Sequence, residues 1–268
     1  MNDTTQPTLA PMVRKLQLWH PLSEADRRAV LDLPFVEREL DAGQYIVWEG
    51  DRPQNACLLL SGFAYRHKLA GDGGRQILAI HMKGDLVDLQ NSLLGIADHN
   101  VQMLSAGRVA MIPVEDMRDI AFACPAVGMA MWYETLVEGA IFREWIVNIG
   151  RRDALTRIAH LLCEISLRLD VAELGHQTEY ELPISQEQLA DAVSLTSVHV
   201  NRKLMELESG GLIKRTKRMI EVNDWPALAR VGDFQSRYLH VHARKDPPLP
   251  AAPPGHLRAV PQPRPHPL

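Results

Sequence analysis

Residues 185–222 constrain the fold of this chain more than any other segment, because they contain the start signals of two successive short helices. Ser185 and Gln188 have the spacing of a capping box, which predicts a helix that begins at Gln186. Thr196 predicts the N-cap of a second helix only a short turn later. Two helices joined by so short a turn are typical of a helix-turn-helix, in which the second helix enters the major groove of DNA.

The second predicted helix has one apolar face and one polar face. Apolar residues recur on it at intervals of three and four, which predicts a buried stripe formed by Val200, Leu204 and Leu207. The helix is expected to end near Ser209, because Gly210-Gly211 supplies the backbone freedom of a helix C-terminus. The residues on the other face that we expect to read DNA bases are Ser197, Val198, His199, Asn201 and Arg202.

A basic hairpin is expected to follow the second helix. The residues predicted to contact the DNA backbone, at the helix starts and on this hairpin, are Ser185, Gln186, Thr196, Lys203, Lys214, Arg215, Lys217 and Arg218. Residues 185–224 contain six basic and six acidic residues, so the segment has no net positive charge. The cations are concentrated at 202–203 and 214–218, and a DNA footprint needs such local sorting more than net charge. The alternative is a plain helical hairpin with a solvated basic loop.

This segment resembles the winged helix of the Crp/Fnr family of bacterial transcription regulators, and the resemblance extends over roughly residues 15–225. It implies an α+β protein with an N-terminal double-stranded β-roll similar to cyclic-nucleotide-binding domains, a long dimerisation helix and a C-terminal winged helix-turn-helix. We therefore expect a β-roll sensor domain at 12–122, the dimerisation helix at 123–152 and the DNA-binding domain at 153–240. A disordered proline-rich tail is expected at 241–268.

The function implied by the resemblance is sequence-specific regulation of transcription. Such a protein would bind a pseudo-palindromic double-stranded DNA operator as a homodimer and work with RNA polymerase. The rival readings are a β-roll that serves as an interaction module controlled by protein partners, and an enzyme. No catalytic motif is present, so we expect no enzymatic activity.

The pattern of residues 35–114 supports the β-roll, because short apolar runs alternate there with turn signals. Four glycines match the turn glycines of the family's β-roll, namely Gly43, Gly50, Gly62 and Gly84. Short helices are expected over residues 12–33, with Ser23 as a cap. Residues 1–11 are expected to be disordered.

Residues 125–152 predict a long helix that is apolar almost all the way round. Such a helix must be buried on more than one side, here against the β-roll and against the same helix of a second chain. The residues predicted to form the dimer contact are Val137, Ile141, Trp145 and Ile149. The alternative is a core helix of a single domain. Asp153 predicts the cap of a further helix, at the place where the resembled family has its hinge.

The nucleotide-binding members of the family hold the cyclic phosphate with a Gly-Glu-Leu motif and a later Arg followed by Ser or Thr. The matching positions form the candidate effector pocket and are Gly84, Asp85, Leu86, Asp98 and His99. No Arg or Lys lies between Lys83 and Arg108, and Asp88 adds another negative charge. Because a buried phosphate needs a cation, we expect no tight binding of cAMP or cGMP at this site. Whether an unknown small-molecule effector exists stays open.

No cofactor and no metal site is predicted. Cys57, Cys124 and Cys163 are far apart, which excludes the cysteine cluster of the family's iron–sulfur sensors. His81 and His99 raise the alternative of a haem-dependent gas sensor, but no second ligand follows at a fixed spacing. No apolar run approaches the roughly 20 residues of a membrane span, and the N-terminus lacks an apolar signal core. We therefore expect a cytoplasmic protein without membrane contact.

Overall fold

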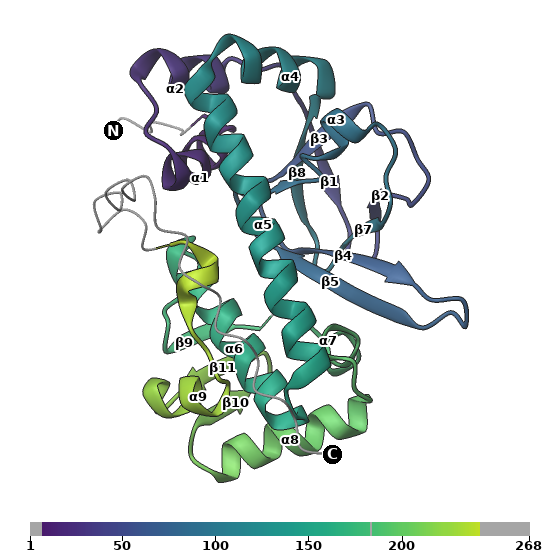
Figure 1. Ribbon diagram of the computed structural model, residues 1–268, viewed down its shortest axis with the longest axis vertical. Coiled ribbons are helices and arrows are strands. Elements are labelled where there is room, and N and C mark those ends of the chain that lie inside the picture. Colours follow the sequence, from purple (N-terminus) through teal and green to yellow (C-terminus); the bar gives the residue numbers. More distant parts are fainter. Residues whose placement is uncertain (1–6, 183, 242–268) are drawn as a thin grey trace, which may run out of the picture.

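The chain forms an N-terminal β-domain and a C-terminal helical domain, which one long helix connects (Figure 1). The computed structural model describes residues 7–182 and 184–241. The expected α+β class, with a β-roll before the long helix and a helix-turn-helix after it, is confirmed. The tail that was expected to be disordered lies, from residue 242 onward, outside the described residues.

Two four-stranded antiparallel sheets make up the β-domain. The first has the order β1-β8-β3-β6, with β1 Val36–Leu40, β8 Gly107–Pro113, β3 Asn55–Leu59 and β6 Leu86–Val87. The second has the order β2-β7-β4-β5, with β2 Tyr45–Val47, β7 Asn100–Met103, β4 Ala64–Leu69 and β5 Arg75–His81. Apolar side chains from both sheets, such as Val47, Leu59 and Val101, pack together between them and form the core of the roll.

The four glycines predicted at turns all have positive φ angles. Gly62 shows why a glycine is needed, because its φ is +79° and an added Cβ would lie 2.6 Å from the carbonyl oxygen of Ala106. The chain can therefore reverse direction between β3 and β4 only with a residue that lacks a side chain.

Four short helices surround the β-roll: α1 Ala10–Trp19, α2 Glu24–Leu31, α3 Asn91–Leu94 and α4 Val114–Ala123. Ser23 caps α2 as predicted, and it forms a reciprocal capping box with Asp26. The expected disorder of residues 1–11 is wrong at its C-terminal end, because α1 begins at Ala10 and Pro11 lies in its first turn, where proline is favoured. Apolar residues of α1 pack with the first sheet and with the start of the long helix.

The long helix, α5, spans Pro125–Arg151 and runs from α4 to the C-terminal domain (Figure 1). Two residues predicted at the dimer contact, Val137 and Trp145, are instead buried in their own chain. The indole N–H of Trp145 donates to Glu164 on the next helix at 3.0 Å, and Ile141 packs against the same core. Ile149, the fourth predicted residue, is half-buried. Because α5 is apolar on two sides, periodicity alone cannot say which side faces a second chain, so the dimer contact stays a prediction.

Within the described residues, no single helix has both the length and the apolar character needed to cross a membrane. Helices α4 and α5 together meet those two criteria, but they meet at a bend of 118°.

The C-terminal domain begins at α6, Ala154–Val171, whose N-cap Asp153 accepts the backbone N–H groups of Leu155 and Thr156. Its other elements are β9 Glu179–Glu181, α7 Gln186–Val193, α8 Ser197–Ser209, β10 Ile213–Thr216, β11 Met219–Val222, α9 Trp225–Val231 and the short 3-10 helix η1 Ser236–Leu239. The strands form one antiparallel sheet in the order β10-β11-β9. The core of this domain is continuous with the outer side of β4 and β5, through Tyr65, Ile77 and Ile80.

Candidate nucleic-acid interface and effector pocket

Helices α7 and α8 form the predicted helix-turn-helix with the predicted boundaries. Ser185 and Gln188 form the capping box, and the Thr196 hydroxyl accepts the backbone N–H of His199. The turn between the helices needs a left-handed residue, and Ser194 supplies it with a φ of 54°. The side chain of Gln186 donates to Asn201 at 3.1 Å and so ties the start of α7 to α8.

The face of α8 that was predicted to read bases is largely open to solvent. Val198 is 79% exposed, and Ser197 and Arg202 are also exposed. His199 and Asn201 are half-buried beside them. The apolar stripe of Val200, Leu204 and Leu207 is fully buried on the opposite face. In the view of Figure 1, α8 lies at the lower end of the molecule. The turn before it contacts the β-roll, because the Ser194 hydroxyl donates to Gln76 of β5 at 2.7 Å. The exposure of Ser197, Val198 and Arg202 leaves this face of α8 open to a duplex.

Met205 extends the same open face by one turn, and it is 57% exposed. The sequence did not single it out, since an apolar residue at this spacing is ordinarily assigned to the core. Its exposure is the only signal that assigns it to the outer face. An exposed thioether next to Arg202 can contact thymine methyl groups or a sugar face, because its surface is apolar and flexible.

The predicted phosphate-binding cations fall into two groups. Lys203, Lys214 and Arg215 are engaged by acidic neighbours, at 2.7 Å from Glu206, 3.2 Å from Glu221 and 2.6 Å from Glu208 respectively. Lys217 and Arg218 form the two-residue turn between β10 and β11, and both are exposed. Neither these two nor Arg202 has an ion pair within the described part of the chain. The hairpin tip and Arg202 therefore offer the cations most available to DNA.

A stripe of residues along α5 faces away from the chain's own core. Met129, Trp132, Tyr133, Leu136, Ile146 and Val147 are all substantially exposed. Met129, Tyr133, Leu136 and Val147 lie at the spacing of a heptad repeat, with Ala140 and Arg143 at the intervening positions. Ala140 is buried in its own chain and Arg143 is charged, so the apolar repeat is interrupted between Leu136 and Val147. Heptad spacing is that of a two-stranded coiled coil, in which apolar side chains insert between residues of a second helix.

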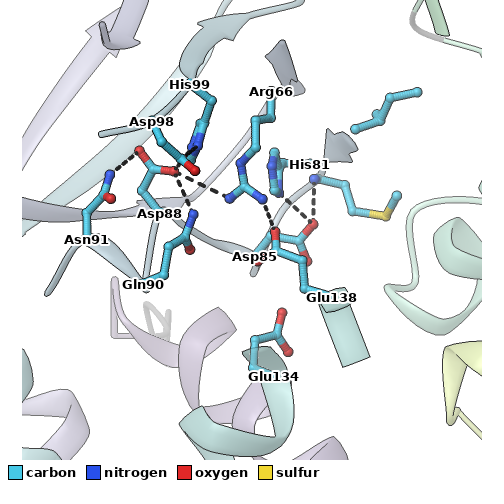
Figure 2. Close-up of polar contacts among 12 residues, drawn as sticks. Arg66, His81, Asp85, Asp88, Gln90, Asn91, Asp98, His99, Glu134 and Glu138 are labelled. Atoms are coloured by element: carbon cyan, nitrogen blue, oxygen red, sulfur yellow. Dashed lines mark hydrogen bonds and ion pairs between the residues drawn. The ribbon is translucent and has the colours of Figure 1, made fainter. Parts of the chain in front are cut away.

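The candidate effector pocket is filled by the chain's own charged side chains (Figure 2). Arg66 on β4 is 2% exposed, and its guanidinium lies 3.4 Å from the Asp88 carboxylate and 2.6 Å from that of Glu138 on α5. His99 lies 2.5 Å from the same Asp88 carboxylate, and Asn91 donates to it at 3.1 Å. This cluster of Arg66, Asp88, Asn91, His99 and Glu138 is called the Arg66 cluster below.

Arg66 points into the β-roll by the ordinary alternation of β4, because Ala64 packs in the core of the roll and the intervening Tyr65 packs in the core of the C-terminal domain. Both faces of β4 are buried here, so Arg66 is enclosed although it is charged. The register shift between the two strands leaves Leu78 of β5 unpaired, since Arg66 is opposite Ala79 and His67 is opposite Ile77.

The Asp85 carboxylate, in the predicted position of the ribose-binding Glu, is held by two other cations. Lys15 of α1 lies 2.7 Å from one oxygen, and Arg168 of α6 lies 3.3 Å from the other. Burial alone would raise the pKa of Asp85, but the attraction of Lys15 and then of Arg168 lowers it to about 2. Arg168 also donates to the carbonyl oxygen of Ile80 at 2.8 Å. The carboxylate thus joins the β-roll to α1 and to the first helix of the C-terminal domain.

These contacts correct one premise of the sequence analysis. No Arg or Lys lies between Lys83 and Arg108, but Lys15, Arg66 and Arg168 reach the pocket from other elements. Each of these cations is already paired with a carboxylate. Asp98 does not line the pocket, since its side chain is 79% exposed and contacts only the outer nitrogen of His99.

The residues considered for cofactors are engaged or buried. Both ring nitrogens of His99 lie 2.5 Å from carboxylate oxygens, of Asp88 and Asp98. Cys57 and Cys163 are buried, and burial raises the pKa of the Cys163 thiol to about 12. Within residues 7–182 and 184–241, no group of three or more His, Cys, Asp or Glu residues is arranged to hold a metal ion. Because the described residues do not bring the cysteines together, this arrangement does not fit an iron–sulfur cluster.

Comparisons with known proteins agree with both halves of this architecture. The family model described as a cyclic nucleotide-binding domain matches residues 37–123, and that of a Crp-like helix-turn-helix domain matches residues 156–231. The transcriptional activator protein FnrL of Cereibacter sphaeroides is 28% identical over 212 residues, which cover 76% of this chain and 84% of the relative. The nitrogen fixation regulation protein FixK of Azorhizobium caulinodans is 27% identical over 179 residues, which cover 66% of this chain and 71% of the relative.

Solved structures share the same fold. The structure of FixK2 from Bradyrhizobium japonicum has a TM-score of 0.67 at 23% identity, and the match covers 74% of this chain and 98% of that one. The structure of a CooA variant from Carboxydothermus hydrogenoformans has a TM-score of 0.62 at 18% identity and covers 87% of this chain and 97% of that one.

Proposed function

Because the chain belongs to the Crp/Fnr family of transcription regulators, we propose that it binds a pseudo-palindromic DNA operator as a homodimer. The observation that carries this proposal is the open face of α8, with Val198 and Arg202 exposed beside the cationic tip at Lys217 and Arg218. In this reading α8 of each chain enters the major groove, and the hairpin tip contacts the adjoining phosphates.

The exposed stripe on α5 supports the homodimer. A soluble monomer would leave Tyr133, Leu136 and Val147 in water, whereas a second α5 helix packed at heptad spacing would cover all three. Two-fold symmetry would then set the operator's half-sites about 10 base pairs apart, centre to centre.

The experiment is selection of bound duplexes from a random pool, followed by fluorescence anisotropy on the selected sequence at several salt concentrations. We expect a two-fold-related motif and a preference of at least about 1,000-fold over random duplex, which is typical of specific regulators. Sedimentation of the protein with and without DNA gives the stoichiometry. Equal affinity for the selected and the random duplexes would refute the proposal.

The second part of the proposal concerns the effector: the β-roll does not bind cAMP or cGMP tightly. Support comes from the Arg66 cluster, because a cyclic phosphate would have to displace Asp88 from a buried guanidinium. Calorimetric titration with cAMP tests this directly. Micromolar binding that an Arg66→Met substitution abolishes would contradict it.

The remaining partners follow from the same function. FnrL is a transcriptional activator and FixK is a nitrogen fixation regulation protein, so we expect no catalytic activity in this chain. We also expect no iron–sulfur cluster, because the cysteines are far apart, and no haem. A regulator that acts on an operator together with RNA polymerase would be located in the cytoplasm. Activation and repression are distinguished by transcription in vitro from a promoter that carries the selected operator.

A further inference from the structure

A cavity of about 470 Å³ lies where the β-roll, α1, α5 and the C-terminal domain meet. Its walls come from α1, the loop at Gly84-Asp85-Leu86, the middle of α5, the end of α6 and η1. Arg66 and Asp88 do not line it, but Glu138 of the Arg66 cluster does, and so do Gly84, Asp85 and Leu86 of the candidate effector pocket, so the cavity adjoins the part of the β-roll that the Arg66 cluster fills. Its volume falls within the range of small-molecule sites, about 300–1,000 Å³.

The wall formed by α5 carries two carboxyl groups one helical turn apart, those of Glu134 and Glu138. Glu134 lies 3.6 Å from Lys15, and it also accepts the indole N–H of Trp19. Phe142 lines the same wall one turn further along, with Val137 and Ile141 between them. Carboxylates next to aromatic and aliphatic side chains form the kind of surface that binds an organic ammonium group with an apolar body.

The charged side chains that line the cavity are evenly divided between carboxylates, which are Asp85, Glu134, Glu138 and Glu173, and cations, which are Arg14, Lys15, Lys83 and Arg168. Burial nevertheless raises the pKa of Glu134, because the attraction of Lys15 offsets only part of the cost of burying the carboxylate charge. A ligand cation beside Glu134 would lower that cost further.

His81 adds a hydrogen-bonding group that the protein leaves unused. Its ring is about 5% exposed and lines the cavity, and its Nε2 atom has no hydrogen-bond partner within the described residues. Its Nδ1 atom faces Asp85 at 3.9 Å (Figure 2). A proton on Nδ1 would leave Nε2 as an acceptor, which an ammonium N–H can satisfy.

We propose that this cavity is a binding site for a small organic amine, with the ammonium group held by Glu134, Glu138 and His81 and the apolar body packed on Val137 and Phe142. Calling the amine an effector rests on the proposed regulatory function. The structural reason to expect a regulatory effect is Arg168, which belongs to α6 and pairs with Asp85 at the edge of the same cavity. A bound cation would therefore act at the junction of the two domains.

The test is calorimetric titration of the full chain with 4-phenylbutylamine and with 4-phenylbutan-1-ol, which have the same apolar body but differ in charge. We expect saturable binding of the amine, at least about tenfold tighter than that of the alcohol. Glu134→Gln should remove most of this difference while leaving the alcohol unaffected. Glu115→Gln is the matched control, because the Glu115 side chain is 83% exposed and lies outside the cavity.

Val137→Trp fills the cavity and should abolish binding of both compounds. If that variant does not fold, the Glu134→Gln comparison still decides. Absence of saturable amine binding, equal binding of the two compounds, or an unchanged difference in Glu134→Gln would each overturn the proposal. None of these measurements contains DNA, so a failure here is distinct from a failure of operator binding.

Discussion

Replacing Arg66 by Met should destabilise the β-roll strongly, because it removes the cation of a buried cluster and keeps most of the side-chain volume. The guanidinium and the Asp88 carboxylate are 2% and 1% exposed, so water can replace neither. Removing one partner of a buried ion pair costs about 3–5 kcal/mol. We expect a value near the lower end, about 3 kcal/mol, since Asp88 keeps His99 and Asn91 and since Glu138 is 22% exposed.

The assay is urea unfolding followed by far-ultraviolet circular dichroism and tryptophan fluorescence. A loss of about 3 kcal/mol corresponds to a fall in Tm of roughly 6–12 °C for a protein of this size. The control is Arg108→Met, whose guanidinium pairs with Glu37 at the surface and should cost less than about 1 kcal/mol. Combining Arg66→Met with Asp88→Asn should recover part of the loss, because the second change removes the uncompensated charge.

The reasoning fails if Arg66→Met costs no more than Arg108→Met. It also fails if the losses from Arg66→Met and Asp88→Asn add without coupling, because contacts at these distances require an interaction term. In either case the β-roll would not depend on the Arg66 cluster, and the pocket would be open to a ligand at little cost.

Three further predictions concern DNA binding, assembly and pH. Arg202→Ala should weaken operator binding by about 1–3 kcal/mol and relax preference at one base position, whereas Lys217→Ala should weaken binding to every sequence and flatten the salt dependence, both measured by anisotropy. Leu136→Glu should convert a dimer to a monomer in sedimentation experiments, while Leu93→Glu, also at an exposed leucine, should not. Burial lowers the pKa of His81 well below 6.5, so below that pH the unfolded chain binds a proton that the folded chain does not bind. The unfolding free energy should therefore fall as pH drops below 6.5, by at most about 1.4 kcal/mol per pH unit for this group. His81→Gln should reduce that slope in urea titrations, and an unchanged slope would assign the effect to other groups.

The helix-turn-helix could be predicted from the sequence almost to the residue because its signals are local. Ser185 and Gln188 satisfy each other's backbone N–H groups across three residues, and the Thr196 hydroxyl caps α8 by accepting the backbone N–H of His199. Such contacts need no information about the rest of the fold. The same holds for Asp153 at the start of α6.

The chemistry of the pocket could not be predicted, because its cations are supplied by tertiary pairing. Arg66 lies 22 residues before Asp88, and Arg168 lies 83 residues after Asp85. A search for positive charge along the cassette segment therefore finds none. The burial of Arg66 also has no sequence signature, since a charged residue in a strand is ordinarily assigned to the solvent face.

The dimer face of α5 was a choice between two apolar stripes. Val137, Ile141, Trp145 and Ile149 recur every four residues, whereas Met129, Tyr133, Leu136 and Val147 follow the heptad spacing. Both patterns are apolar, and only the packing of Trp145 against Glu164 shows which stripe the chain uses for itself. The Leu136→Glu experiment therefore tests whether the stripe that contains Leu136, rather than the one that contains Val137 and Trp145, forms the dimer contact.

The extent of any switch is limited by the way the two domains pack. Tyr65, Ile77 and Ile80 are buried in the core of the C-terminal domain. Full burial of an apolar side chain stabilises the folded state by about 1.5–3 kcal/mol, or roughly 5–9 kcal/mol for the three together. Arg75 adds a 2.7 Å ion pair to Asp191 on α7. Coupling between a ligand and a distant site is typically only about 1–3 kcal/mol. A ligand at the junction could therefore tilt the helix-turn-helix on this shared core, but it could not release the domain, so we expect regulation by small changes in the spacing of the two α8 helices.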